Sequence, residues 1–531
     1  MWDKRTVVKR VSVVSALLIS AVAFADKLEP DDLPGPPLEV IKTPTRVEIP
    51  VLPGFDLPVT EPGFRSSREL RVRGKAALGA EVKVRGYITW VYDCAAQLAS
   101  VNPEATRAQI LMSIDSDPSL CERPKFYLGD SKDTSQEASI WVVEVPRAPT
   151  KSERLRLSRD ELKAWPAVPR IATGEYVTVT GTWAQRSPHG EFNGDGLLIF
   201  KSLAPATPGA GAAATAPVVF GKEPEISVVT KAPLRPEVDP TIRNTSVDHL
   251  NACNKAITAK QYDAALKECQ LATKLWAGNH LAWFAWGSAH MARSEWSQAR
   301  TALERALALR PDQGMYQLYE GISLYEAEVL RAKEDQARRE NKKPDEITLD
   351  PTGLKLDAAR DALVRATRLV PALWRGHYYL GRVYRDLDDP RRAAEQFTRT
   401  IALHPTYRYA YIALIELYRR WDYLDQAIAV ANVGTANVPP ADAGELWFEL
   451  GMAYDARRAD GKAVEAFSTA IALRPDDVNA KFQRGQILAR KGEIAAARRD
   501  LEEVSKSTDP KLVSEKQVAN QLLAQIAARK H

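Results

Sequence analysis

The sequence contains little of what several classes of protein depend on. Only 4 of its 531 residues are cysteines, too few for a fold built on disulfides. Its 73 lysines and arginines nearly balance 68 acidic residues, and the net charge of +5 does not single out nucleic acid as a partner. No apolar run reaches about 18 residues, which excludes a polytopic membrane protein.

Patterns that carry catalysis are also missing. The 7 histidines form no HExxH or similar cluster, and neither GxxxxGK[ST] nor GxSxG occurs. Residues 209–214 match GxGxxA by letters, but they lie in an Ala-Pro segment with no strand before them and no helix after them. We therefore expect a protein that is not an enzyme and that needs no metal or cofactor.

The N-terminus has the pattern of a secretory signal. Basic residues at positions 4, 5, 9 and 10 precede an apolar run over 11–24, and Ala23-Phe24-Ala25 supplies the small residues of a cleavage site. This order predicts a signal peptide over 1–25 and an exported protein of the periplasm or cell envelope. The alternative is an uncleaved run, in which residues 11–25 anchor the chain in the inner membrane and provide its only membrane contact.

Two linker-like segments divide the rest of the chain. Proline recurs throughout 26–65, which predicts an extended spacer, and 204–240 is rich in alanine, proline and glycine, which predicts a flexible linker. Two folded parts remain, at 66–203 and from 241 onward. At 45% hydrophobic and 27% charged residues, the composition is that of a globular protein.

The first folded part shows the alternation of β-strands. Residues 81–92 place Val82, Val84, Ile88 and Trp90 on one face, and further strands are predicted at 125–128, 139–145, 175–183 and 196–202, with a helix at 158–165. Five strands with a helix before the fourth resemble the OB-fold, and Gly86 suits its coiled first strand. The fold class is therefore α+β multidomain: a small five-stranded OB-like β-barrel followed by an all-α superhelix.

The OB-fold resemblance raises the possibility that aromatic side chains bind nucleic acid or glycan. Tyr87, Trp90, Tyr92, Tyr127, Trp141 and Trp183 are available, but we expect most of them in the barrel core. Export makes nucleic acid an improbable ligand. In an oxidising compartment Cys94 and Cys121 are expected to form a disulfide.

The second folded part repeats with a period of 34. Its clearest unit is Trp447-x2-Leu450-Gly451-x2-Tyr454, followed by Ala463-x3-Phe467, Ala470 and Pro475. This is the signature of the tetratricopeptide repeat, and the chain resembles that family over seven units within 241–510. One unit is interrupted by a charged insertion at about 331–352, read as a longer first helix with a solvated loop or as a projecting partner contact. Residues 511–531 are predicted to form a capping helix.

In the first repeat, Cys253 and Cys269 fall where the repeat has a small and a bulky residue, and a bridge and two buried thiols remain equally open.

The family resemblance implies a concave groove that binds a protein segment. Carried onto this register, the partner-binding positions are Phe284, Met291, Tyr325, Tyr378, Arg382, Arg385, Tyr409, Arg419, Phe448 and Phe482. Because arginine and tyrosine dominate the middle of the groove, we expect an acidic or carboxylate-bearing segment as the partner. The alternative is that neighbouring acids pair with these arginines. The carboxylate clamp of the chaperone-tail-binding repeats is absent, since its positions here include Ile412 and Glu416.

The sequence thus predicts an exported, non-catalytic scaffold that binds other envelope proteins through its concave groove. The alternative is a ligand-binding protein in which the OB-like barrel captures nucleic acid or glycan and the repeats act as a positioning arm.

Overall fold

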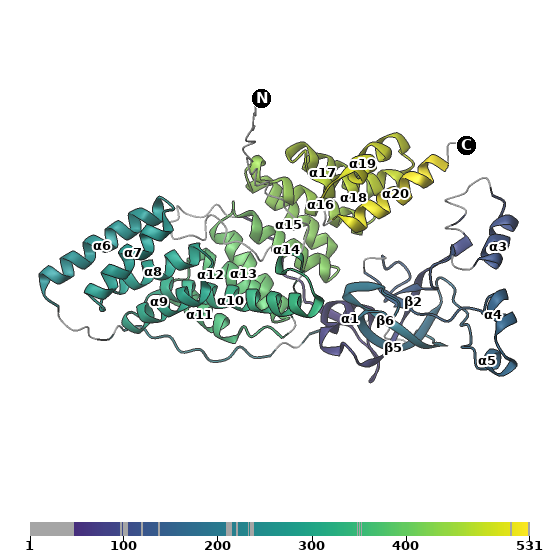
Figure 1. Cartoon of the computed structure of the whole chain (residues 1–531), viewed down its shortest axis with the longest axis horizontal. Coiled ribbons are helices and arrows are strands. Elements are labelled where there is room, and N and C mark those ends of the chain that lie inside the picture. The colour runs from purple at the N-terminus through teal and green to yellow at the C-terminus, as the bar shows by residue number, and fades with distance from the viewer. Residues whose placement is uncertain are drawn as a thin grey trace, which may run out of the picture.

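The computed structural model describes residues 47–528 apart from short gaps (Figure 1). The gaps are 96–97, 99–104, 118–119, 136–137, 209–214, 219–220, 232, 234–237, 348, 350, 352 and 510–511. The predicted signal peptide and the first part of the predicted spacer lie outside the described residues. Among the helices that are described, none combines the length and the apolar character needed to cross a bilayer.

Five strands form a closed sheet in the N-terminal half: β2 (Glu81–Val91), β3 (Phe126–Gly129), β4 (Ile140–Val143), β5 (Tyr176–Arg186) and β6 (Phe192–Pro205). The strand order is β2-β3-β4-β6-β5, and β5 pairs back onto β2. The β4–β6 pair is parallel and the others are antiparallel. Short helices surround this barrel domain: α1 (Ser67–Arg73), η2 (Gly74–Ala77), α3 (Arg107–Ser116), α4 (Lys151–Arg156) and α5 (Arg159–Lys163).

The barrel core confirms the predicted alternation with one correction. Val82, Val84 and Ile88 point inward and are buried, but Trp90 is only half-buried. The register between β2 and β3 shifts between Ile88 and Trp90, which pairs Trp90 with Tyr127. Because a bulge of one residue moves every later side chain to the opposite face, Trp90 lies on the outside of the barrel.

Seven antiparallel helix pairs and a final helix follow within the described residues (Figure 1). The pairs are α6 (Pro240–Thr258) with α7 (Tyr262–Leu275), α8 (His280–Ala292) with α9 (Trp296–Leu309), α10 (Gly314–Glu340) with α11 (Asp357–Leu369), α12 (Trp374–Asp386) with α13 (Pro390–Leu403), α14 (Arg408–Arg420) with α15 (Leu424–Asn437), α16 (Gly444–Ala456) with α17 (Asp460–Leu473), and α18 (Val478–Lys491) with α19 (Ile494–Lys506). The last helix, α20 (Val513–Ala528), packs on α18 and α19.

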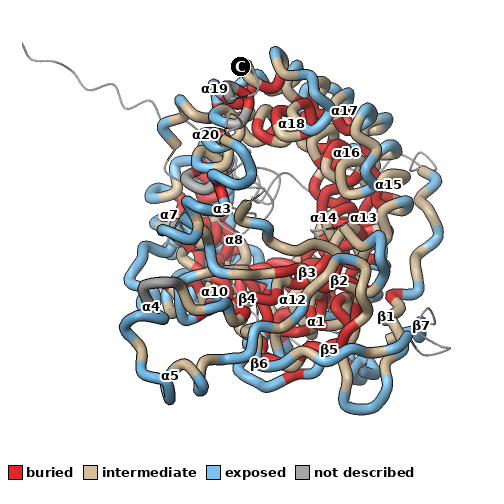
Figure 2. Tube along the Cα trace, turned by 90° about the vertical axis from the view of Figure 1, so that its right-hand side faces the viewer, coloured by how far each residue is buried: buried red, intermediate tan, exposed pale blue. Residues whose placement is uncertain are grey.

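Five of the described pairs pack through a glycine on the first helix and a large residue on the second: Gly287 with Leu303, Gly321 with Leu363, Gly381 with Phe397, Gly451 with Phe467 and Gly485 with Leu501. A Cβ atom at Gly381 would lie 2.6 Å from the Phe397 ring, and one at Gly451 would lie 2.7 Å from the Phe467 ring, so only glycine allows this approach. Buried residues recur along the helices of the array, as on α13 to α18 in Figure 2.

The turn between the two helices of a pair also recurs. Lys260, Ser294, Asp388 and Asp422 all adopt a left-handed conformation, with φ between 57° and 61°. The two aspartates occupy equivalent turns of successive repeats.

The insertion in the third pair lengthens its first helix. Helix α10 extends to Glu340, and Lys333 and Ala337 within the extension are buried. At its end, the hydrogen bonds that Lys342 and Gln336 donate to Glu340 lower the pKa of that carboxyl, and the charge of Arg186 on β5 lowers it further. The extension is therefore part of the packed structure.

The described ends of both linker-like segments pack on the repeats, which differs from a free spacer and a free linker. Strand β1 (Asp56–Pro58) pairs with β7 (Thr215–Pro217), and Phe55 is fully buried. Arg368 and Arg392 donate hydrogen bonds to backbone carbonyls of 221–226, and the Tyr384 hydroxyl donates to Glu223. Proline keeps a chain extended, but apolar residues of an extended chain can still pack against the surface of a neighbouring domain. We call these two segments the strap: it comprises Phe55 with β1, and β7 with the described residues up to 226.

Helix α1 attaches the barrel domain to two turns of the array. Arg71 donates to the Arg420 carbonyl at 2.8 Å and pairs with Asp422, while Arg73 donates to Asp388 at 3.0 Å. The barrel domain is thus held both by the strap and by α1.

Candidate protein-binding groove

The first helices of the pairs form the inner side of the array. Helix α6 contacts α8, α8 contacts α10, α10 contacts α12, α14 contacts α16, and α16 contacts α18. Among the described residues, successive second helices make no contacts of comparable extent. Elements on the inside of a curve lie closer together, so the first helices line the concave face.

All the residues predicted for the groove lie on first helices. Phe284 and Met291 are on α8, Tyr325 on α10, Tyr378, Arg382 and Arg385 on α12, Tyr409 and Arg419 on α14, Phe448 on α16 and Phe482 on α18. Burial divides the set. Met291, Tyr325, Tyr378, Arg382, Tyr409 and Phe482 are buried in the packing between helices, whereas Phe284, Arg385, Arg419 and Phe448 are half-buried.

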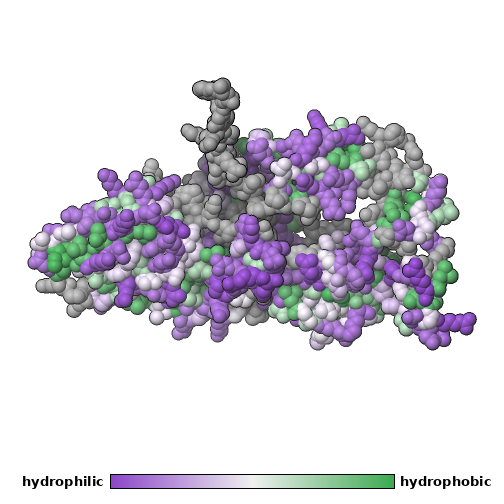
Figure 3. All heavy atoms as spheres, viewed as in Figure 1, coloured by the Kyte–Doolittle hydropathy of each residue, from purple (hydrophilic) through white to green (hydrophobic). Residues whose placement is uncertain are grey.

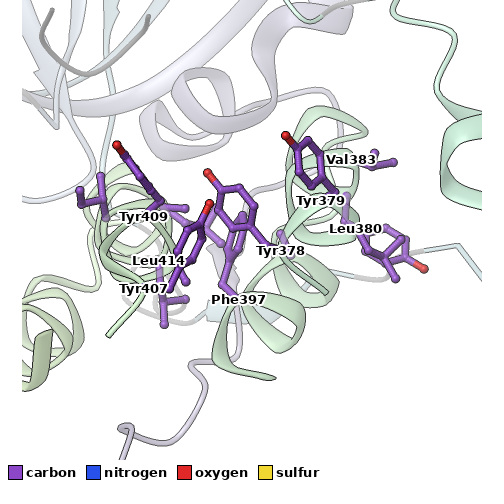
Figure 4. Close-up of a cluster of buried hydrophobic side chains, with 14 of the residues drawn as sticks. Tyr378, Tyr379, Leu380, Val383, Phe397, Tyr407, Tyr409 and Leu414 are labelled. Carbon is purple, nitrogen blue, oxygen red and sulfur yellow. The ribbon is translucent and has the colours of Figure 1, made fainter. Parts of the chain in front are cut away.

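The tyrosines form a packed cluster in the middle of the array (Figure 4). The ring centroids of Tyr378 and Tyr407 are 5.0 Å apart, and those of Tyr407 and Tyr409 are 5.5 Å apart. Figure 4 shows the hydroxyls of Tyr378, Tyr379 and Tyr409 pointing to the same side. These rings are part of the hydrophobic core, and their hydroxyl groups lie along one edge of it.

Arg382 is held inside this cluster. Its Nη1 donates to Glu326 Oε1 at 3.1 Å, and its guanidinium carbon lies 4.7 Å from the Tyr325 ring centroid and 5.0 Å from that of Tyr379. The pair is buried on both sides. A charge removed from water in this way requires a partner, and Glu326 and the rings provide one.

The other two groove arginines also face acids. Arg385 Nε donates to Asp386 Oδ1 at 2.9 Å, and the Tyr325 hydroxyl donates to Asp386 Oδ2 at 2.6 Å. Arg419 Nη1 donates to Glu449 Oε2 at 2.6 Å. The structure therefore shows the alternative considered above, in which neighbouring acids neutralise the arginines.

Glu416 differs from these acids. Its Oε1 atom is buried and receives no hydrogen bond within the described part of the chain. Burial raises the pKa of Glu416, and the nearby Glu449 carboxylate raises it further, against the opposing effect of Arg385 and Arg419. From the sequence, Glu416 indicated only that the carboxylate clamp is absent, because the repeat register does not tell which charged side chains lie close together in space.

The barrel domain carries its aromatic residues mostly on the outside. Of the six aromatic side chains named in the sequence analysis, only Trp183 is in the core, where Gly196 leaves room for its ring. Trp90, Tyr92, Tyr127 and Trp141 are half-buried and form a row with ring centroids 5.0 to 6.4 Å apart. The remaining two tyrosines, Tyr87 and Tyr176, are also half-buried and pack together at 4.8 Å. The expectation that most of these rings are core is therefore wrong, and the bulge accounts for the position of Trp90.

Two disulfides are present. Cys94 and Cys121 are joined with Cα atoms 5.4 Å apart, and Cys253 and Cys269 with Cα atoms 5.3 Å apart. The second bridge joins α6 to α7 and is fully buried. Its two residues have the 16-residue spacing of Gly381 and Phe397, so the bridge occupies the site of the small–large contact in other repeats.

Over the described residues, no group of three or more histidine, cysteine or acidic side chains is arranged to hold a metal ion.

Comparisons with known proteins agree with the repeat geometry. The family model described as tetratricopeptide repeat matches residues 284–330, 378–442 and 448–511. No curated protein matches the sequence significantly. Similar solved structures include a tetratricopeptide repeat protein from Parabacteroides merdae, at 12% identity and a TM-score of 0.35, covering 54% of this chain and 99% of that one. PilF of Pseudomonas aeruginosa is 14% identical with a TM-score of 0.35, covering 47% of this chain and 99% of its own. Residues 284–330, 378–442 and 448–511 of the repeating second half are therefore tetratricopeptide repeats.

Proposed function

We propose that this protein is an exported scaffold that binds a segment of another envelope protein along the concave face of its repeats. Tetratricopeptide repeat proteins are generally protein-interaction scaffolds, and their fold is typically non-catalytic. The observation that carries the proposal is that the first helices pack on one another along one face, apart from α12 with α14, with half-buried Phe284 near one end and Phe448 near the other.

Export is supported by the disulfides and by the basic and apolar start of the chain. Disulfides persist in oxidising compartments and are rare where thiols are kept reduced. N-terminal sequencing of the protein from envelope fractions tests the proposal. A chain that begins at Asp26 supports cleavage, and one that begins at Met1 supports the anchored alternative.

The acidic partner segment predicted from the sequence would be energetically unfavourable in this groove. An acidic segment would have to compete with Glu326, Asp386 and Glu449 for the arginines that they already contact. The displaced acids would then lose their own partners, which is costly in a buried setting.

Photo-crosslinking in the living cell tests the groove directly. A benzophenone amino acid replaces Phe448, which lies on the concave side, or Arg391, which lies on second helix α13 and is 65% exposed at its side chain. The proposal expects a discrete crosslinked protein from position 448 and none from position 391. The same product from both positions, or from 391 alone, would place the contact elsewhere.

For the barrel domain we propose an OB-like module. The proposal is supported by the pairing of its first strand with its second and fourth strands and by the parallel pairing of its third with its fifth. The row of aromatic side chains on the outside of the barrel would be the ligand-binding surface of this module. Titration of the full chain with single-stranded oligonucleotides and with soluble glycans, each at low and high salt, measures whether this module retains a ligand.

A further inference from the structure

One acid among the first helices lacks a hydrogen-bonded cation in the described part of the chain. Glu416 lies on α14, between α12 and α16 in the order of first helices, and no described residue forms an ion pair with it at hydrogen-bond distance. Its buried Oε1 has no donor. A buried acceptor in this state destabilises the folded protein, and more so when it is charged.

The basic residues nearby are already engaged by other acids. Arg385 on α12 binds Asp386, and Arg419 on α14 binds Glu449. On α16, Glu445 is approached by Arg408 at 3.5 Å and by Arg474 at 3.1 Å. Each of these cations therefore has an acid other than Glu416 as its partner.

We propose that Glu416 receives a lysine or arginine side chain from a protein segment bound in the groove. Glu416 as a whole is partly exposed, so a cation in the groove can approach its side chain and form a charge-assisted hydrogen bond to the carboxylate in a poorly solvated setting. This inference rests on the proposed function, and it assigns the partner a charge opposite to that expected from the arginines alone.

Binding should also release a proton. The groups facing Glu416 from the helices around it are Arg385 and Asp386 on α12, Arg419 on α14, and Glu445 and Glu449 on α16. Burial, together with the Glu449 carboxylate, raises the pKa of Glu416 to about 8, and burial also raises the pKa of Glu449, so these two carboxyls share a proton in the free protein at neutral pH. An arriving cation favours the carboxylate and expels up to about one proton at pH 7.

Pools of degenerate nine-residue peptides provide the probe. Each pool has its central position fixed as lysine, arginine, glutamine or glutamate, and fluorescence anisotropy measures binding to the full chain. We expect the lysine and arginine pools to bind at least about tenfold more tightly than the glutamate pool, which corresponds to about 1.4 kcal/mol. Glu416→Gln should abolish this difference. Calorimetry in two buffers of different ionisation enthalpy should detect the released proton for the unmodified protein only.

A matched variant separates binding from folding. Glu320 is also buried with an oxygen lacking a donor, but it faces Arg300 of α9 and Arg365 of α11, away from the concave face. Glu320→Gln should leave the preference for basic peptides intact, and neither variant should lower the melting temperature. An equal or stronger response to the glutamate pool, a preference that survives Glu416→Gln, or no binding by any pool would overturn the inference. Crosslinking from position 448 would still stand in those cases, so the two proposals fail separately.

Discussion

Phe55 and Trp421 meet edge to face, with ring centroids 5.4 Å apart and ring planes at 88°, although one precedes the barrel domain and the other lies deep in the repeat array. The backbone N–H of Asp56 also donates to the hydroxyl of Tyr423 at 2.7 Å. The strap is therefore anchored by one aromatic side chain that reaches the turn after α14.

Replacing Phe55 with alanine should release the strap. Truncating a fully buried phenylalanine costs about 3–5 kcal/mol, and this cost falls on the contact between the strap and the repeats. We expect limited proteolysis within 204–240 to become at least several-fold faster. Val51→Ala is the control, because Val51 is 89% exposed. Equal cleavage rates in the two variants would show that Phe55 does not anchor the strap.

Removing one partner of the Arg382–Glu326 ion pair should destabilise the protein more than replacing both partners with apolar residues. Glu326→Gln leaves a buried guanidinium without its acid and should cost about 3–5 kcal/mol, measured as a lower melting temperature. The double variant Glu326→Leu with Arg382→Met removes both charges and should lose less than Glu326→Gln alone. Glu304→Gln breaks an exposed pair with Arg300 and should change stability by about 1 kcal/mol at most. A double variant that is less stable than Glu326→Gln would contradict this account.

The disulfide of the first repeat should be replaceable by the packing used elsewhere. Changing both Cys253 and Cys269 to serine removes a cross-link over a short loop and should cost about 3 kcal/mol. Cys253→Gly with Cys269→Leu recreates the contact of Gly287 with Leu303 and should recover part of that loss. Hydrogen exchange of amides in α6 and α7 measures both effects. Unchanged exchange in the double serine variant would show that the bridge contributes nothing to the repeat.

Stability should fall as pH rises through the titration of Glu320. Burial, together with the charge of Glu304, raises the pKa of Glu320 from 4.5 to about 7. Between these values the folded protein keeps a proton that the unfolded chain has lost, so the folded state loses up to about 3 kcal/mol over that range. Glu320→Gln should therefore match the unmodified protein near pH 4.5 and exceed its melting temperature at pH 7.5. Glu395→Gln, on exposed α13, should follow the unmodified protein throughout. A constant difference at all pH values would point to packing instead of titration.

Sequence periodicity was a good guide wherever structure depends on local spacing. The glycines at 287, 381 and 451 and their large partners 16 residues later set the helix pairs, and alternation at 81–88 set the first barrel strand. Contacts between distant segments were not predictable in this way. Nothing in the proline pattern around Phe55 indicates a site beside Trp421, and the groove register does not reveal that Glu326 lies opposite Arg382. Trp90 was misplaced because a bulge leaves no mark in the alternation itself.

The paired turns at Asp388 and Asp422 also determine where on the array the barrel can attach. The backbone repeats this left-handed turn at Arg458, one repeat toward the C-terminus, so its shape alone would allow the barrel domain to shift by one repeat in that direction. Toward the N-terminus the third pair has its insertion in place of this turn, and the nearest earlier turn of this kind is at Ser294. A barrel displaced toward the C-terminus would bring Arg71 against Arg458 instead of Asp422. The side chain in the turn thus distinguishes two docking positions that the backbone alone leaves alike.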